Sequence, residues 1–378
     1  LCDALWCPWL LGLFLLTGLV YSLGSGFFQL FGLRRWWRST AGSLFRRREG
    51  TGGSGLSSLQ ALATALASTM GTGSIAGVAT ALTLGGPGAV FWMWVSAFLG
   101  MMTGCGEKIL SVKYQRPAPG EGLQGGPMFY LRDGLRAPLL AGWFALACLH
   151  ATLAGGSLVQ SSSIAASLEA AFGANRAVVG LCTALLAGAI LAGGLGRIAR
   201  VSSTLVPVMA LLYLGSGGVI LLLNARRLPG ALALIVSSAL SPASALGGGA
   251  GWTVASALRY GVARGVFTNE AGLGTSAMAH GAARADCPAR QGMWGIYEVC
   301  LSTLLVCTVT ALDILVGGLW PLQGVPALSG APLTAAAFSQ ALGPAGQGVV
   351  ALSLLLFAFS SILGWSYYGQ QCLRFLAG

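Results

Sequence analysis

The sequence predicts an all-α protein that crosses a membrane several times. Apolar residues make up 55% of the 378 residues and charged residues only 8%, and the mean hydropathy is +0.76. Soluble domains carry about 25% charged residues. The apolar segments lack the alternating polar pattern of an outer-membrane barrel, so helices are the structure that satisfies the backbone hydrogen bonds in lipid. We expect a single transmembrane domain over residues 1–378.

Nine apolar segments are each long enough for the ~20 residues that cross a bilayer. They cover residues 4–31, 57–84, 87–113, 138–171, 175–196, 201–223, 251–285, 292–317 and 346–376. The first segment has no basic start and no obvious cleavage site, so we interpret it as a helix and not as a signal peptide. Segment 229–250 is broken by Pro and Gly, and we predict a short peripheral helix and a loop there.

The net charge of +11 is unevenly distributed along the chain. The basic cluster RRWWRSTAGSLFRRR (34–48) directly follows an apolar segment, and such clusters stay on the cytoplasmic side of a membrane. This argues against a nucleic-acid partner. It predicts a multi-pass protein of the plasma (inner) membrane with its N-terminus outside. The cluster also suits contact with anionic lipid, at about 1 kcal/mol per charge.

The stretch LASTMGTGSIAGVATALTL (66–84) contains Gly71 and Gly73 within an otherwise apolar segment. Small residues in a membrane helix allow close helix packing, and that alternative stays open. However, Gly71 and Gly73 lie on different helix faces, and each costs about 1 kcal/mol relative to alanine. They therefore predict a break in the helix. At such a break, freed N–H groups can bind a carboxylate and freed carbonyl groups a cation.

A second stretch, RGVFTNEAGLGTSAMAH (264–280), again places two glycines, Gly272 and Gly274, two residues apart. The first break falls in the second predicted helix and the second break in the seventh, five helices later. This spacing predicts two inverted five-helix halves. The halves would cover 57–223 and 251–378, with 4–31 as a preceding helix.

Five blocks of sequence occur in order: GTGSIAGVAT, GGPGAVFWMWVSAFLG, GGPMFYL, VFTNEAGLGTSAMAH and FAFSSILGWSYYG. They resemble the signature blocks of the alanine or glycine:cation symporter family, sodium-coupled amino-acid carriers of the leucine-transporter fold. The resemblance extends from the first helix to the last residue. It implies eleven helices, with one helix before a five-plus-five core. Because nine segments are present here, we expect the second half to be truncated.

The resemblance implies a binding site for a small neutral amino acid, alanine or glycine. Backbone groups at the first break would hold its carboxylate, Gln160 would contact it, Phe267 would cover it and Trp365 would limit its size. Ordinary helix contacts are the alternative for the glutamine and core packing for the aromatic residues. The implied substrate-binding residues are Met70, Gly71, Thr72, Gly73, Gln160, Phe267, Thr268 and Trp365.

The resemblance also implies a sodium site made of backbone carbonyl and hydroxyl oxygens. Its residues would be Ala67, Met70, Phe357, Ser360 and Ser361. A second sodium site would use Ser74, Thr268 and Ser302, but Ser74 replaces the usual asparagine and Ser302 the usual aspartate. Since an amide and a carboxylate are missing, we predict that this second site is weak or absent.

Other polar residues are given structural interpretations. We expect Glu107 and Lys108 to be a solvated pair at a cytoplasmic helix end, and His150 and His280 to be isolated rather than metal ligands. Asp313 is either functional or close to the outer end of its helix. The cysteines show no C-x-x-C spacing, and residues such as Cys148, Cys182, Cys300 and Cys307 are interpreted as small apolar side chains.

Together these features predict a symporter that couples inward sodium flow to amino-acid uptake by alternating access. A proton-coupled or uncoupled amino-acid carrier is the main alternative, and a channel is a weaker one. An intramembrane enzyme is disfavoured because G-x-S-x-G does not fit around Ser74. We expect sodium as a transported ion, no organic cofactor, and a monomer.

Overall fold

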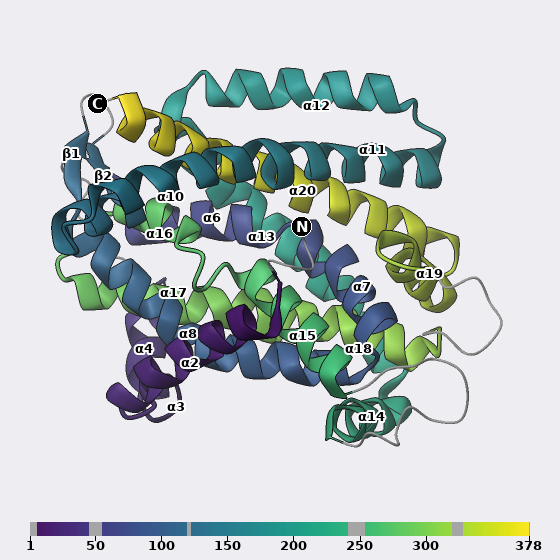
Figure 1. The fold of residues 1–378 in the computed structure, drawn as a ribbon. Coiled ribbons are helices and arrows are strands. Elements are labelled where there is room, and N and C mark those ends of the chain that lie inside the picture. Colours follow the sequence, from purple (N-terminus) through teal and green to yellow (C-terminus); the bar gives the residue numbers. More distant parts are fainter. Residues whose placement is uncertain (1–5, 45–54, 119–121, 241–253, 320–327, 378) are drawn as a thin grey trace.

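The computed structural model describes residues 6–44, 55–118, 122–240, 254–319 and 328–377, which form a bundle of helices (Figure 1). The elements of the first part are α2 (Pro8–Gly24), α3 (Phe28–Phe31), α4 (Leu33–Ser39), α5 (Ala41–Leu44), α6 (Ser58–Thr69), the 3₁₀ turn η1 (Thr72–Ser74), α7 (Ala76–Gly85) and α8 (Gly88–Lys113). A short hairpin of β1 (Arg116–Ala118) and β2 (Gly122–Gln124) follows, with Pro117 opposite Leu123 in antiparallel register.

The middle of the chain forms a second set of helices. They are α9 (Pro127–Phe129), the π-helical η2 (Tyr130–Gly134), α10 (Pro138–Ala151), the π-helical η3 (Thr152–Leu158), α11 (Val159–Phe172), α12 (Arg176–Leu191), α13 (Gly194–Leu223), the 3₁₀ turn η4 (Ala225–Arg227) and α14 (Leu228–Leu240). The helix α14 confirms the short helix expected within 229–250. Residues 241–250 of that segment lie outside the described residues.

The last part of the chain forms a third set. It comprises α15 (Val254–Asn269), α16 (Thr275–Gly281), α17 (Pro288–Val299), the π-helical η6 (Cys300–Cys307), α18 (Thr308–Gly317), α19 (Ala331–Leu342) and α20 (Pro344–Ala377). The sequence did not predict α19 as a separate helix. Helix α20 begins directly after α19, at Pro344, and the two helices pack against each other. The chain therefore turns sharply between them, at Gly343, whose φ is +67°.

Five helical stretches are long and apolar enough to cross a membrane, judged by length and composition. They are Gly88–Lys113, Pro138–Phe172, Gly194–Leu223, Pro288–Gly317 and Pro344–Ala377. Shorter apolar helices are Pro8–Gly24, Ala76–Gly85 and Arg176–Leu191. The helical, multi-pass class predicted from composition is therefore confirmed.

The first helix is shorter than the sequence predicted. Helix α2 ends at Gly24, whereas the apolar segment runs to residue 31. Gly26 and Phe27 have φ values of +63° and +53°, and this left-handed backbone cannot continue a right-handed helix. The short helix α3 therefore starts in a new direction. The basic cluster begins in α4, and its residues 45–48 lie outside the described residues.

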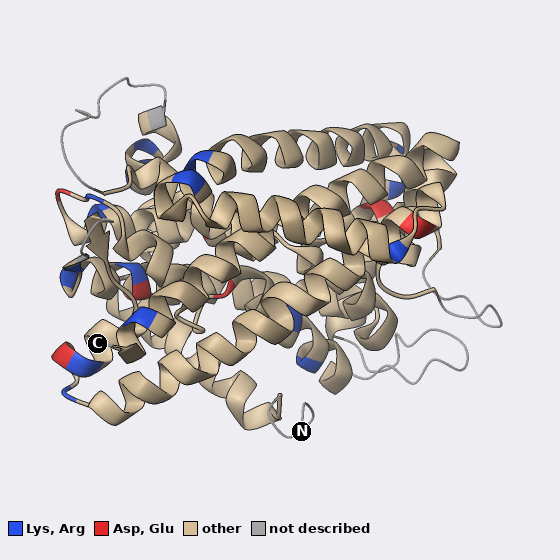
Figure 2. Cartoon of the chain, turned by 90° about the horizontal axis from the view of Figure 1, so that it is seen from above, with Lys and Arg blue, Asp and Glu red and all other residues tan. Residues whose placement is uncertain are grey.

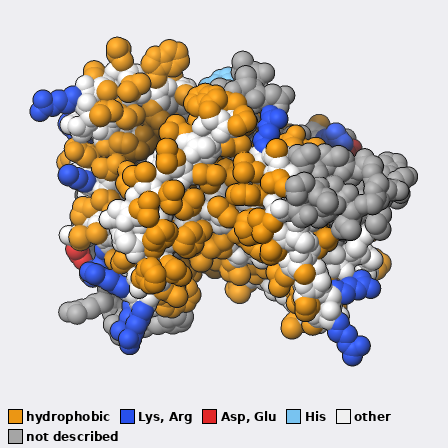
Figure 3. Space-filling view, turned by 60° about the horizontal axis from the view of Figure 1, so that its bottom comes forward, with side chains coloured by type: hydrophobic (Ala, Val, Ile, Leu, Met, Phe, Trp, Pro, Cys, Tyr) orange, Lys and Arg blue, Asp and Glu red, His pale blue; other side chains and the backbone are white. Residues whose placement is uncertain are grey.

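The surface of the bundle suits a lipid environment. Charged residues are concentrated toward the two ends of the bundle and are sparse across its middle (Figure 2). On the face shown in Figure 3, hydrophobic side chains cover the centre, and basic side chains lie mainly at the margins. The outermost helix, α12 at the top of Figure 1, exposes Leu181, Leu185 and Leu186. These side chains match an apolar solvent rather than water.

Candidate substrate and sodium site

The first predicted break is confirmed in the structure. Helix α6 ends at Thr69, Met70 follows with non-helical ψ of 62°, and α7 begins only at Ala76. The short turn η1 joins the two helices. The N–H of Met70 still donates to Leu66 O at 2.8 Å, whereas that of Gly71 has no hydrogen-bond partner among the described residues. A backbone donor is therefore left available at the break.

The second predicted break is also confirmed. Helix α15 ends at Asn269 and α16 begins at Thr275. Between them, Glu270, Gly272 and Gly274 have φ values of +55°, +95° and +75°. Glycine adopts this left-handed conformation without steric cost, which explains why two glycines occur here. The Asn269 side chain accepts a hydrogen bond from the N–H of Ala271 at 3.0 Å.

The two broken helices lie side by side and run in opposite directions. Helix α6 packs against α16, and α7 packs against α15 (Figure 1). The ends of the pair are joined at Leu56, whose N–H donates to Ala282 O and whose carbonyl accepts from Arg284 N. At the centre, a Cβ atom on Gly73 would lie 3.4 Å from Thr268 Oγ1. The two breaks therefore face one another.

Gln160, which the resemblance implies as a substrate contact, lies at the first break. It follows the π-helical segment η3, and its Oε1 accepts a hydrogen bond from Thr72 N at 3.3 Å. Its Nε2 donates to Gly155 O at 3.3 Å. In this conformation the glutamine holds the backbone of the break directly. An incoming carboxylate would compete with Gln160 for the N–H of Thr72.

Two serines of α20 surround the end of α6. Ser360 Oγ donates to Ala67 O at 3.0 Å and to Phe357 O at 2.8 Å. Ser361 Oγ lies 3.1 Å from both Ala67 O and Ser68 O. All these residues are buried. Carbonyl and hydroxyl oxygens are the ligands that a hard cation requires.

Four of the five predicted sodium residues are thus in contact, and the fifth, Met70, lies one turn further along the chain. The close approach of the two helices depends on a glycine. A Cβ atom on Gly364 of α20 would lie 2.7 Å from Ser68 Cβ, so only glycine allows α20 to lie so close to α6 here. This contact brings the serine hydroxyls within reach of the α6 carbonyls.

The residues of the doubtful second sodium site gather around Cys307. Ser74 Oγ and Thr268 Oγ1 are buried without a hydrogen-bond partner among the described residues, and the Cys307 thiol lies beside both. The thiol donates to Ser302 O at 3.3 Å. Sulfur is a soft ligand, whereas hard cations prefer oxygen. Nothing in the sequence places Cys307 here, since its surroundings depend on the packing of η6 against η1.

The two aromatic residues implied for the substrate site have different surroundings. Phe267 lies next to the first break, with its ring 3.6 Å from the position of a Cβ on Gly73, and is 42% exposed. Trp365 packs against Gly156 of η3, and its carbonyl accepts a hydrogen bond from the Thr152 hydroxyl at 3.2 Å. Phe267 therefore borders the break, and Trp365 borders the π-helical segment before Gln160.

The expectation of a solvated Glu107–Lys108 pair is wrong. Lys108 is 0% exposed, and its Nζ lies 3.3 Å from Glu298 Oε2 and 2.7 Å from Ser276 Oγ. The contact to Glu107 is longer, at 4.0 Å. Lys108 lies on the face of α8 that packs against α16 and α17, and helix position alone does not reveal that face. One signal was available: Glu298 lies in a predicted span without a nearby cation in sequence.

His280 belongs to the same network and is not isolated as expected. Its Nε2 lies 3.2 Å from Glu298 Oε2, and its Nδ1 lies 2.6 Å from Gln291 Nε2. His150, in contrast, is exposed on α10. In the described part of the chain no group of three His, Cys, Asp or Glu residues is arranged to hold a metal. The buried network links α8, α16 and α17.

Two further carboxylates support the second break. Glu107 Oε1 accepts a hydrogen bond from Gly272 N at 3.0 Å, and Glu270 accepts one from the Thr275 hydroxyl. Phe14 of α2 covers the break, because its ring fills the space that a Cβ on Gly272 would need. These contacts hold a peptide segment that has left helical hydrogen bonding.

A bundle in which two antiparallel broken helices meet, with buried oxygens gathered beside one break, defines a membrane transporter. The chain belongs to the sodium:alanine symporter family, whose model matches residues 1–378. It is therefore a transporter of the symporter class and not an enzyme.

The chain is similar to several curated proteins over nearly all its length. It is 43% identical to an uncharacterized transporter of Haemophilus influenzae, covering 96% of this chain and 78% of that protein. It is 40% identical to the sodium/alanine symporter AgcS of Methanococcus maripaludis, and the match covers 99% of this chain and 82% of that symporter. It is 36% identical to the probable sodium/glutamine symporter GlnT of Bacillus subtilis, and the match covers 99% of this chain and 76% of that protein.

Among solved structures, the chain resembles the manganese transporter of Eremococcus coleocola. The TM-score is 0.56 at 16% identity, and the match covers 85% of this chain and 65% of that transporter. This likeness shows a shared transporter fold, and at this identity it carries no information on the cargo.

Proposed function

We propose that this protein couples inward sodium movement to the uptake of a small neutral amino acid by alternating access. The observation that carries the proposal is the contact of Ser360 and Ser361 with the carbonyl of Ala67, beside the break in α6. Sodium would take the place of the hydroxyl–carbonyl hydrogen bonds and fasten α6 to α20. The amino-acid carboxylate would then dock at the break between Met70 and Gly73, at the free N–H of Gly71 and the N–H of Thr72 that Gln160 now occupies.

Several features support this substrate class. Phe267 and Trp365 would restrict the size of the side chain, and Thr268 lies against the break on the opposite helix. Relatives are named as sodium/alanine and sodium/glutamine symporters, which supports an amino-acid cargo. We propose alanine or glycine as the substrate. For coupling, both ligands must bind the closed form more tightly than the open form. A ligand that binds both forms equally does not change the equilibrium between them.

The arrangement in the membrane is part of the same proposal. The antiparallel pairing of α6–α7 with α15–α16 supports two inverted repeats, at 57–223 and 251–378, after the helix within 4–31. We propose one transmembrane domain that works as a monomer. The N-terminus would lie outside the plasma (inner) membrane and the basic cluster 34–48 inside.

A proton-coupled carrier is the second candidate. One relative in Bacillus subtilis, 37% identical, is named as a putative sodium/proton-dependent alanine carrier. The test is uptake of radiolabelled alanine into proteoliposomes with an inward sodium gradient, compared with a choline gradient. We expect saturable uptake only with sodium. Equal uptake in choline would refute sodium coupling, and stimulation by an inward proton gradient would then favour the second candidate.

Replacing either serine of the proposed sodium site should weaken sodium binding. For Ser360→Ala or Ser361→Ala we expect the sodium concentration for half-maximal uptake to rise about tenfold, equivalent to ~1.4 kcal/mol, because one oxygen ligand is lost. The double variant should lose sodium stimulation. Ser353→Ala, also buried on α20, is the matched control and should behave like the wild type. Unchanged sodium dependence in the double variant would contradict the site.

The sodium stoichiometry tests the second, doubtful site at Ser74, Thr268 and Ser302. We expect about one sodium ion per amino acid, because a thiol and serine hydroxyls replace the amide and carboxylate that the resemblance implies there. The flux ratio of radiolabelled sodium to alanine measures this number. Ser302→Asp should raise the ratio, and the uncharged Ser302→Asn is its control. A ratio of two in the wild type would refute the prediction.

A further inference from the structure

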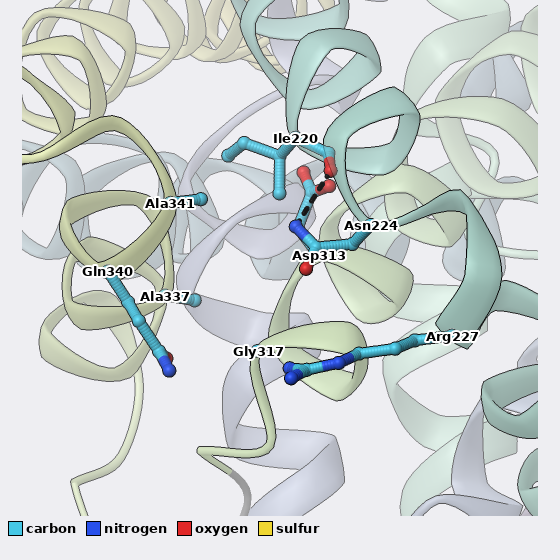
Figure 4. Close-up of a pocket in the computed structure, with 8 residues that line it drawn as sticks. All are labelled: Ile220, Asn224, Arg227, Asp313, Gly317, Ala337, Gln340 and Ala341. Carbon is cyan, nitrogen blue, oxygen red and sulfur yellow. Dashed lines mark hydrogen bonds between the residues drawn. The ribbon is translucent and has the colours of Figure 1, made fainter.

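A cavity away from the two breaks contains a buried carboxylate. It has a volume of about 120 Å³ and lies between the ends of α13, α18 and α19 (Figure 4). Its lining residues are Ile220, Asn224, Arg227, Asp313, Gly317, Ala337, Gln340 and Ala341. Asp313 is 0% exposed to solvent, and neither of its carboxylate oxygens has a hydrogen-bond partner among the described residues. A buried charge without a partner is costly, so Asp313 either stays protonated or binds a cationic partner that the described side chains do not provide.

The fold leaves room for this carboxylate at a glycine. A Cβ atom on Gly217 of α13 would lie 2.7 Å from Asp313 Oδ2. Only a glycine therefore allows Asp313 to occupy its position beside α13. Within the described part of the chain, packing and not hydrogen bonding holds the carboxylate in place.

A cationic side chain lines the same cavity without pairing with Asp313. Arg227 Nη1 donates to Val316 O at 3.0 Å, and no ion pair with Asp313 forms among the described residues. A guanidinium has five N–H donors, so Arg227 retains donors for a ligand. In Figure 4, Arg227 and Gln340 extend toward each other from opposite sides of the cavity.

Amide oxygens add hydrogen-bond acceptors to the wall. Asn224 Nδ2 donates to Ile220 O at 3.0 Å, which leaves its Oδ1 as an acceptor. Gln340 supplies the other amide oxygen. Its Oε1 lies beside Gly317 in the cavity wall, 3.2 Å from the position that a Cβ on this glycine would occupy. The cavity thus combines an unpaired carboxylate, a guanidinium and two amides. These groups complement an ammonium and a carboxylate on one small molecule.

We propose that this cavity is a second binding site for a zwitterionic amino acid, with the ammonium at Asp313 and the carboxylate at Arg227. Its size fits this ligand, because an engineered cavity of about 150 Å³ holds benzene. A single sodium ion would fill only part of the space and would leave Arg227 unused. Glycine and alanine match the cavity in both size and charge. The inference does not rest on the proposed transport function, since none of these residues belongs to the proposed transport site.

The second site has a direct structural link to the first break. Thr310, one helical turn before Asp313 on α18, donates its hydroxyl to Ser74 O at 2.9 Å. Thr310 Oγ1 also lies 2.7 Å from the hydroxyl of Tyr213 on α13. A ligand that binds Asp313 therefore contacts α18, the same helix whose Thr310 hydroxyl is bonded to the backbone of the first break at Ser74.

Equilibrium binding of radiolabelled glycine and alanine to the purified protein tests the proposal. We expect two bound amino acids per wild-type chain and one in Asp313→Asn or Arg227→Gln, with affinity at the lost site reduced at least tenfold. Asp286→Asn and Arg226→Gln, both at exposed positions, are the matched controls and should still bind two. Gly71→Ala should remove the other site and leave binding at Asp313 intact.

Several outcomes would overturn the proposal. Unchanged binding in both Asp313→Asn and Arg227→Gln would do so, whether the wild type binds one amino acid or two. Sodium or guanidinium binding that depends on Asp313, without amino-acid binding, would show a cation site instead. If Asp313→Asn does not fold, Arg227→Gln decides the result because its side chain is exposed. Loss of uptake with retained binding at Asp313 would refute the transport proposal alone.

Discussion

Gly71→Ala is expected to abolish sodium-driven amino-acid uptake. A Cβ atom at this position would lie 2.5 Å from Ser361 Oγ and 3.4 Å from Gln160 Oε1. The first distance is far inside van der Waals contact, so the serine hydroxyl or the break must move. Such a movement separates Ser361 from the carbonyls of Ala67 and Ser68, and at the same time narrows the space for a substrate carboxylate.

We expect initial uptake to fall at least a hundredfold, which corresponds to about 2.7 kcal/mol. Radiolabelled uptake into proteoliposomes measures it, and the yield of monodisperse protein separates loss of function from loss of folding. Gly180→Ala on the half-buried surface of α12 is the matched control, because a Cβ there meets nothing within 4 Å. Wild-type uptake by Gly71→Ala would show that the break does not form the site.

Lys108→Met is expected to destabilise the protein strongly. The substitution removes the cation that lies 3.3 Å from Glu298, and both side chains are 0% exposed. Breaking a buried ion pair by removing one partner costs about 3–5 kcal/mol, because the other charge stays buried without compensation. His280 and Glu298 would lose the group that completes their network. Thermal unfolding of the detergent-purified protein should show a large fall in the midpoint.

A double variant distinguishes the ion pair from simple packing. Lys108→Met combined with Glu298→Gln removes both charges, and we expect it to be more stable than Lys108→Met alone. Lys113→Met, at an exposed position on the same helix α8, is the matched control and should unfold like the wild type. If Lys108→Met also unfolds like the wild type, or if the double variant shows the full sum of the two single effects, the buried pair does not stabilise the protein as proposed.

The candidate site could be predicted from the sequence where it depends on local backbone properties. Gly71 and Gly73 predicted the first break, and Gly272 and Gly274 the second, because glycine both destabilises a helix and permits left-handed backbone. The motif resemblance selected Gln160, Ser360 and Ser361, and the structure places all three at the first break. Their transport roles remain predictions that the uptake experiments test.

The buried polar groups could not be predicted in the same way. Lys108 is five residues from the end of its helix, a position where a solvated side chain is the ordinary expectation. Only the packing of α17 and α16 against α8 brings Glu298 and Ser276 to its amine. Asp313 is the only acid within 299–317, but its surroundings come from Gly217, Arg227 and Gln340, which lie in other parts of the chain.

The sequence by itself determined that this protein is a helical membrane protein of the sodium:alanine symporter family with two interrupted helices. These features follow from composition, from glycine placement and from contiguous motifs, all of which act within a few residues of chain. Only the tertiary structure decided which hydroxyls meet the α6 carbonyls, that Lys108 is buried with Glu298, and that Asp313 lines a cavity. Such contacts join helices far apart in the chain, and they depend on how each helix is rotated and how closely its glycines let it approach its neighbours.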